Sequence, residues 1–167
     1  TTVLSYLLVG YLTTSAASTR AAKQALIVTT FGGLAMLVGI VLLGESAGTY
    51  RISALLAEPQ TGTVIAWGIG LLLVGAITKS AQFPFHFWLP GAMAAPTPVS
   101  AYLHAAAMVK AGVYLVARIA PGYADLLTWQ VVVLVLGGFT MLLGGFRSTR
   151  QTDLKLLLAY GTVSQLG

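Results

Sequence analysis

Three basic side chains stand within apolar stretches of this sequence: Lys79, His104 and Lys110. A lysine at the centre of a membrane helix costs about 2.5–3.5 kcal/mol even on the lower scales, so such residues usually face a bundle interior and mark ion or proton paths. Burial can lower the pKa of a lysine until it exchanges protons, and histidine already titrates near neutrality. We therefore interpret the three residues as candidate stations of a proton relay.

Each candidate also has a simpler explanation. A lysine near a helix end can extend its ammonium to the membrane surface, and a histidine can act as a neutral hydrogen-bonding group between helices. Lys79 lies in the middle of its apolar run, which argues against the first explanation. His104 and Lys110 would lie about 9 Å apart along a helix axis and about 120° around it, so they fit successive stations linked by water better than a direct pair. We expect His86, in the aromatic stretch 85–88, to belong to an interfacial aromatic belt.

The composition predicts a membrane protein rather than a soluble domain. Hydrophobic residues make up 57% of the chain and charged residues only 8%, whereas soluble domains average about 25% charged residues. The net charge of +5 comes from cations scattered between apolar runs, so we expect contact with membrane lipid and not with nucleic acid. The chain has no cysteine and its two histidines lack a nearby carboxylate, so the sequence predicts neither a metal site nor a cofactor.

Apolar runs divide the chain into helices of about the 20 residues that cross a hydrocarbon core. The predicted fold is a single all-α domain, a polytopic transmembrane helix bundle. Its expected spans are 1–13 (partial), 25–44, 62–95, 97–117, 126–146 and 154–167 (partial). Because both ends of the sequence fall inside apolar runs, we expect it to be part of a longer chain.

The run 62–95 is too long for one straight crossing, and it contains Pro84. Proline lacks a backbone donor and clashes with the preceding turn, so it ends or kinks a helix. In lipid, a broken backbone persists only where protein or a cavity satisfies the freed groups. We therefore expect one broken helix, with two half-helices joined near 80–84 and Lys79 beside the break. Ser80 and Gln82 are expected to cap or hydrate the freed groups.

Glycines recur seven residues apart in two of these runs, as Gly68 and Gly75, Gly137 and Gly144, and Gly138 and Gly145. Residues at this spacing share one helix face, and small residues let membrane helices approach closely. The three pairs therefore predict close helix packing.

Basic residues are distributed unequally between the alternate connectors. One set holds five of them and the opposite set holds two: Arg20, Lys23, Arg147, Arg150 and Lys155 against Arg51 and Arg118. Because Lys and Arg concentrate in cytoplasmic loops, we expect connectors 14–24 and 147–155 in the cytoplasm. The residue 1 end then lies toward the outside.

Several short stretches together resemble a known family. They are residues 79–84, 88–90, 96–101, 104–106, 108–112, 153–155, 158–160 and 162–167. They are similar to the antiporter-like membrane subunits, which include the large proton-pumping subunits of respiratory complex I and the A subunit of Mrp-type multisubunit Na⁺/H⁺ antiporters. The stretch 85–91 and Lys110 look closer to the Mrp A subunit than to complex I.

The resemblance implies a broken helix with a central lysine, at Lys79, and a relay residue on the next helix, at His104. It also implies a glutamate partner for Lys79 on an earlier helix, about two residues before Thr1. The implied function is the proton-conducting core of a bacterial cell-membrane antiporter, a transporter and not an enzyme, which exchanges Na⁺ for H⁺ together with other subunits of a hetero-oligomeric complex. Two alternatives stay open: a proton-pumping subunit of complex I without antiport of its own, and a scaffold in which Lys79 is structural.

Overall fold

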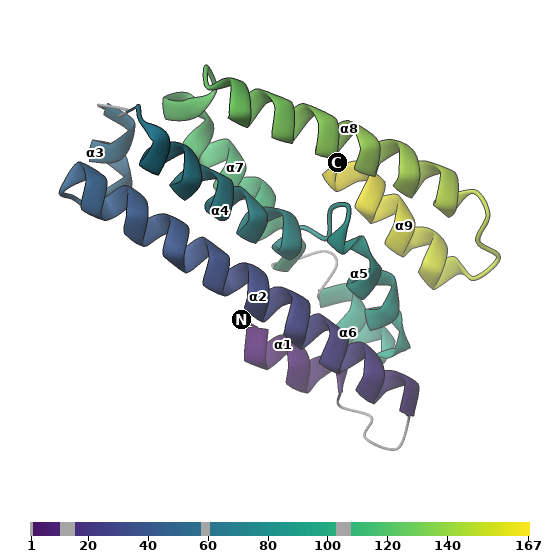
Figure 1. Ribbon diagram of the computed structural model, residues 1–167. Coiled ribbons are helices and arrows are strands. Elements are labelled where there is room, and N and C mark those ends of the chain that lie inside the picture. The colour runs from purple at the N-terminus through teal and green to yellow at the C-terminus, as the bar shows by residue number, and fades with distance from the viewer. Residues whose placement is uncertain (1, 11–15, 58–60, 103–107) are drawn as a thin grey trace.

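The computed structural model describes residues 2–10, 16–57, 61–102 and 108–167. These residues form helices joined by turns, and the described part of the chain contains no strand (Figure 1). The all-α prediction is therefore confirmed. His104 lies outside the described residues.

The bundle is built from two long helices, Ala16–Ala47 and Leu127–Ser148, and from shorter helices that pack against them. The elements in chain order are α1 (Thr2–Val9), α2 (Ala16–Ala47), α3 (Ile52–Ala57), α4 (Thr63–Lys79), the short 3-10 helix η1 (Phe85–Phe87), α5 (Trp88–Gly91), the 3-10 helix η2 (Ala92–Ala94), α6 (Thr97–Ala101), α7 (Met108–Tyr123), α8 (Leu127–Ser148) and α9 (Leu154–Leu166). Helix α2 packs along α4, α7 packs on another side of α4, and α8 pairs with α9 (Figure 1).

The ends of several helices differ from the ends of the predicted spans. Helix α2 begins at Ala16, so Arg20 and Lys23 stand on a helix where the sequence predicts a connector. Helix α7 continues through Pro121 to Tyr123. The connector after α2 contains the short helix α3. Polar residues are compatible with a helix once it leaves the apolar core, and proline in a last turn removes only its own backbone donor.

Large apolar side chains face outward along two helices. On α2 they recur at helical spacing as Ile27, Phe31, Leu34, Val38 and Val41. On α8, Leu134 and Leu142 are 72% and 68% exposed. The segments Ser18–Ala47 and Leu127–Ser148 are each long and apolar enough to cross a membrane. These faces suit lipid or further membrane helices, since water would not solvate them.

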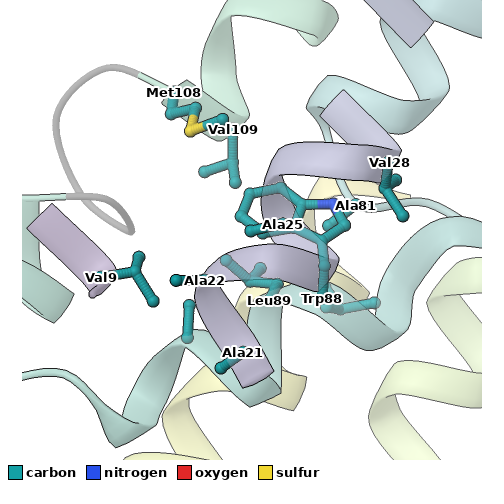
Figure 2. Packing of buried hydrophobic residues seen from close by; sticks show 12 residues of the cluster. Val9, Ala21, Ala22, Ala25, Val28, Ala81, Trp88, Leu89, Met108 and Val109 are labelled. Carbon is teal, nitrogen blue, oxygen red and sulfur yellow. The ribbon is translucent and has the colours of Figure 1, made fainter. Parts of the chain in front are cut away.

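Buried apolar side chains form two clusters. One cluster surrounds Trp88 and Leu89 and includes Ala25 of α2 and Val109 of α7 (Figure 2). The other contains residues of α2, α4, α7 and α8, namely Leu43, Ile65, Ile69, Leu72, Leu73, Ile119, Tyr123 and Trp129. The segment that joins α4 to η1 is anchored in the first cluster through Ala81, which is fully buried there.

Glycines permit the closest helix contacts. A Cβ added to Gly75 of α4 would lie 2.7 Å from the carbonyl oxygen of Gly32 on α2, and one added to Gly144 of α8 would lie 2.6 Å from the backbone nitrogen of Ser164 on α9. The predicted packing is confirmed for the pairs that contain Gly75 and Gly144. It is wrong for Gly138, because a Cβ there would meet no described atom within 4 Å.

Gly144→Ala should therefore lower the melting temperature of the solubilised complex. The added methyl group would collide with the backbone of α9, and overpacking of this kind costs about 1–3 kcal/mol. Gly138→Ala is the matched control on the same helix; it has open space, and alanine has a higher helix propensity than glycine. Equal melting temperatures for the two variants would contradict the close contact between α8 and α9.

Candidate functional site

Helix α4 ends in a Schellman motif. The backbone N–H of Gln82 donates to the carbonyl oxygen of Ile77 at 3.0 Å, and that of Ala81 donates to Thr78 O at 3.4 Å. This pair of bonds needs a residue in the left-handed conformation, and Ala81 adopts it with φ of 50°. Glycine is usual at this position, and another residue there costs about 1–2 kcal/mol. The break is therefore a defined turn that the surrounding structure has to hold.

Pro84 prevents the helix from continuing. In a continued helix its ring would clash with the carbonyl group of Ser80, four residues earlier, and its nitrogen could not donate. The break that the sequence predicts near 80–84 is present, and helical geometry resumes at Phe85. The peptide bond between Phe83 and Pro84 is cis. The second half is a succession of short turns (η1, α5 and η2) rather than one regular half-helix.

Polar side chains connect the break to other parts of the bundle. Ser80 Oγ donates to the carbonyl oxygen of Val109 on α7 at 2.9 Å. Gln82 Nε2 donates to Leu166 O on α9 at 3.0 Å. Trp88 Nε1 donates to Thr78 O at 3.0 Å, so the second half of the broken helix satisfies a carbonyl group of the first. The side chains of Ser80 and Gln82 thus bond to neighbouring helices, while their backbone amides bond back to the end of α4.

A small cavity lies beside these contacts. It has a volume of about 180 Å³, and its polar side chains are Ser80 and Gln82. Gly112 of α7 forms part of its wall, and a Cβ at this glycine would collide with Ser80 Oγ and Ala76 O. Helix α7 can therefore approach the end of α4 only with glycine here. The cavity is large enough for water molecules next to the break.

Lys79 is the last residue of α4 and is half-buried. Its Nζ donates to Thr2 Oγ1 on α1 at 2.9 Å. The C-terminal end of a helix carries a partial negative charge of about half a unit, which stabilises a nearby cation by about 0.3–1 kcal/mol. Lys79 also lines a cavity of about 340 Å³ with side chains of α2 and α7, among them Met36 and Met108. The break thus offers the ammonium a favourable dipole, a hydroxyl partner and open space.

Lys110 lies on a different cavity from Lys79. Its side chain is exposed and lines a groove of about 360 Å³ between α6, α7 and α9. Lys155 of α9 lines the same groove, together with polar side chains such as Gln165. The structure therefore brings Lys110 near Lys155 and does not bring it to Lys79. The predicted link through His104 lies outside the described residues.

His86 is buried, with 7% of its surface exposed, so the expected interfacial belt is wrong for this residue. Its Nε2 lies 3.2 Å from NH1 of Arg147 on α8. A guanidinium group can only donate, so Nε2 accepts and the imidazole is neutral. The contact was not predicted, because nothing local in the sequence relates residues 61 positions apart.

The described residues contain no group of three or more His, Cys, Asp or Glu side chains that could hold a metal ion. The polar groups at the break are instead an ammonium, hydroxyls, an amide and backbone atoms. Such a site can bind and pass protons or orient water, and it lacks the carboxylate oxygens that a hard cation prefers.

A bundle with lipid-compatible faces and a helix broken inside the packed bundle is typical of integral membrane proteins, because a broken backbone persists in a membrane only where protein or a cavity satisfies its freed groups. Residues 1–167 match the family model described as NADH:quinone oxidoreductase/Mrp antiporter, TM. The chain belongs to this family.

Several relatives are named as antiporter subunits. The chain is 48% identical to a Na(+)/H(+) antiporter subunit of Staphylococcus saprophyticus and 46% identical to a Na(+)/H(+) antiporter subunit of Bacillus subtilis, in both cases over the whole of this chain and 21% of the relative. It is 51% identical to a protein of Rhizobium meliloti whose name describes a probable K(+)/H(+) antiporter subunit, over 17% of that protein. The chain thus spans about a fifth of the length of these relatives.

Two solved structures share the fold. The Mrp complex from Dietzia sp. DQ12-45-1b contains a chain that is 42% identical, with a TM-score of 0.93 over 99% of this chain and 18% of that one. The membrane-bound sulfane sulfur reductase, an archaeal respiratory membrane complex, contains a chain that is 26% identical, with a TM-score of 0.89 over 99% of this chain and 35% of that one.

Proposed function

We propose that this chain is part of the proton-conducting core of a multisubunit cation/proton antiporter, in which Lys79 binds and releases the transported proton. The observation that carries the proposal is the position of Lys79 at the end of a broken membrane helix, half-buried and next to a cavity. Identity of 46–48% to Na(+)/H(+) antiporter subunits supports Na⁺ as the exchanged cation. Another relative is named as a probable K(+)/H(+) antiporter subunit, so K⁺ is the first alternative cation to test against Na⁺.

The contact between Lys79 and Thr2 supports the expected ion pair. The family resemblance implies a glutamate about two residues before Thr1. Side chains three residues apart lie on the same face of a helix, so a glutamate there would share the face on which Thr2 meets Lys79. An ammonium shared between a carboxylate and a hydroxyl can exchange its proton as the carboxylate charge changes.

From Lys79, the proposed relay continues through His104 to Lys110. Lys110 lines an open groove with a second cation, Lys155, and with hydroxyl and amide groups. Polar side chains along such a groove support water-linked proton transfer toward Lys110. The relay residues, the other subunits of a hetero-oligomeric complex and a bacterial cell-membrane location are all parts of this proposal.

A redox-driven complex is the second candidate. The respiratory sulfane sulfur reductase contains a chain with the same fold, and the family description includes NADH:quinone oxidoreductase. In that setting the same helices would pump protons coupled to electron transfer elsewhere, without antiport of their own. Higher sequence identity to the antiporter subunits favours the first candidate.

Lys79→Ala should abolish cation-driven proton movement while the complex still assembles. Loss of a positioned proton-transfer group lowers rates by about a hundredfold or more, whereas a half-buried lysine on a cavity contributes little to packing. The measurement is collapse of a pH gradient in everted vesicles on addition of Na⁺ or K⁺, normalised to assembled complex.

Lys23→Ala is the matched control, because Lys23 is an exposed lysine on α2. It should retain the wild-type rate. Antiport at the wild-type rate in Lys79→Ala would rule out the assigned role. Assembled complex that moves protons only with an electron donor and acceptor would support the redox-driven candidate.

His104→Gln should slow antiport by about tenfold or more if the side chain must gain and lose a proton in each cycle. Glutamine keeps hydrogen-bonding capacity and most of the volume, but it does not titrate. A histidine that only bonds helices together contributes about 0.6 kcal/mol and would tolerate the change. Rate against pH for wild type and variant decides between the two roles. Overlapping curves would remove His104 from the relay.

The expected orientation can be tested with single cysteines, since the chain has none of its own. Thr61 lies in the connector before α4, and Thr152 lies between α8 and α9; both are exposed. A membrane-impermeant maleimide added to intact cells should label Thr61→Cys, and it should label Thr152→Cys only in everted vesicles. The opposite labelling pattern would reverse the proposed topology.

A further inference from the structure

Thr140 of α8 contacts the broken helix at Phe83, between its two halves. The backbone N–H of Phe83 donates to Thr140 Oγ1 at 3.0 Å. The Thr140 side chain is fully buried, with 0% exposure, and its hydroxyl donates to Leu136 O of its own helix at 2.6 Å. The hydroxyl proton is therefore directed to Leu136, and an oxygen lone pair is left to accept from Phe83.

The Phe83 amide needs an acceptor from outside the broken helix. The Schellman motif uses the amides of Ala81 and Gln82, and Pro84 has no N–H. The Phe83 amide is thus the first backbone donor after the motif, and it donates to a side chain of another helix. Phe83 is partly buried, and an amide without a partner is costly where water is excluded.

Two further contacts from α8 reach the same segment. The rings of Phe83 and Phe139 meet edge to face, with centroids 4.6 Å apart. Further along α8, Arg147 contacts His86. Since Thr140 and Arg147 are seven residues apart, they lie on one face of α8. This face therefore contacts the broken helix at Phe83, within the break, and at His86, just after it.

We propose that Thr140 is a positioning residue for Lys79. Its hydroxyl fixes the Phe83 amide, and the short turn through Ser80 to Gln82 transmits this position to the end of α4, where Lys79 lies. The inference rests on the proposed role of Lys79 in proton transfer. It assigns to α8, which carries none of the relay residues, the task of setting the geometry in which Lys79 exchanges its proton.

The test compares three substitutions in the assembled complex. Thr140→Val removes the hydroxyl and keeps the shape, and Thr140→Ser keeps the hydroxyl. Thr29→Val is the matched control: Thr29 is 1% exposed and donates to Ala25 O on its own helix at 2.6 Å, as Thr140 does to Leu136. Thr140→Ala replaces Thr140→Val if the valine variant fails to assemble.

Two readouts are needed. The first is the antiport rate per assembled complex as a function of pH. The second is hydrogen–deuterium exchange of the segment 80–88, which reports the Phe83 amide without depending on transport. We expect Thr140→Val to lower the rate about tenfold, to displace the pH midpoint of the rate and to speed exchange. Thr140→Ser and Thr29→Val should both stay close to wild type in rate, in pH midpoint and in exchange.

The outcomes are distinct. A wild-type rate in Thr140→Val overturns the proposal, and so does an equal loss in Thr29→Val. A slower rate with unchanged exchange also overturns it, because Thr140 would then act by another route. If instead Lys79→Ala transports at the wild-type rate, the proposed function fails, while the exchange measurement still decides whether Thr140 holds the break.

Discussion

A broken helix in a membrane exposes backbone groups that lipid cannot satisfy, and the arrangement around Lys79 follows from this constraint. Three groups freed at the end of α4 obtain partners in three different ways. The amide of Gln82 bonds back into α4, the carbonyl of Thr78 accepts from Trp88, and the amide of Phe83 donates to Thr140. The break therefore exists only in the presence of the second half-helix and of α8.

Close helix packing is the condition for these bonds. Gly112 lets α7 reach the end of α4, and Gly144 lets α9 lie against α8, so that Leu166 O can accept from Gln82. Ala81 takes a left-handed conformation at the centre of the turn, and its methyl group is buried in the cluster around Trp88. Packing of this cluster offsets the cost of an alanine where glycine would be unstrained.

Local sequence was sufficient to predict the elements that depend on local chemistry. Pro84 within an overlong apolar run predicted the break, and glycines seven residues apart predicted close helix contacts at Gly75 and Gly144, though not the close approach at Gly112. The contacts of Phe83 with Thr140 and of His86 with Arg147 could not be predicted, because they join residues 57 and 61 positions apart and depend on how the helices pack. Polar residues beyond the apolar core gave no indication that α2 begins as early as Ala16.

The position of Lys79 combines two opposing effects on its charge. Partial burial removes water from the ammonium and disfavours the charged form, whereas the C-terminal end of α4 and the hydroxyl of Thr2 favour it. Both effects depend on where α4 ends, since a shift of one residue along a helix turns a side chain by about 100°. In the proposed relay, a fixed break would therefore hold the Lys79 ammonium beside the same helix end, hydroxyl and cavity through each cycle of proton exchange.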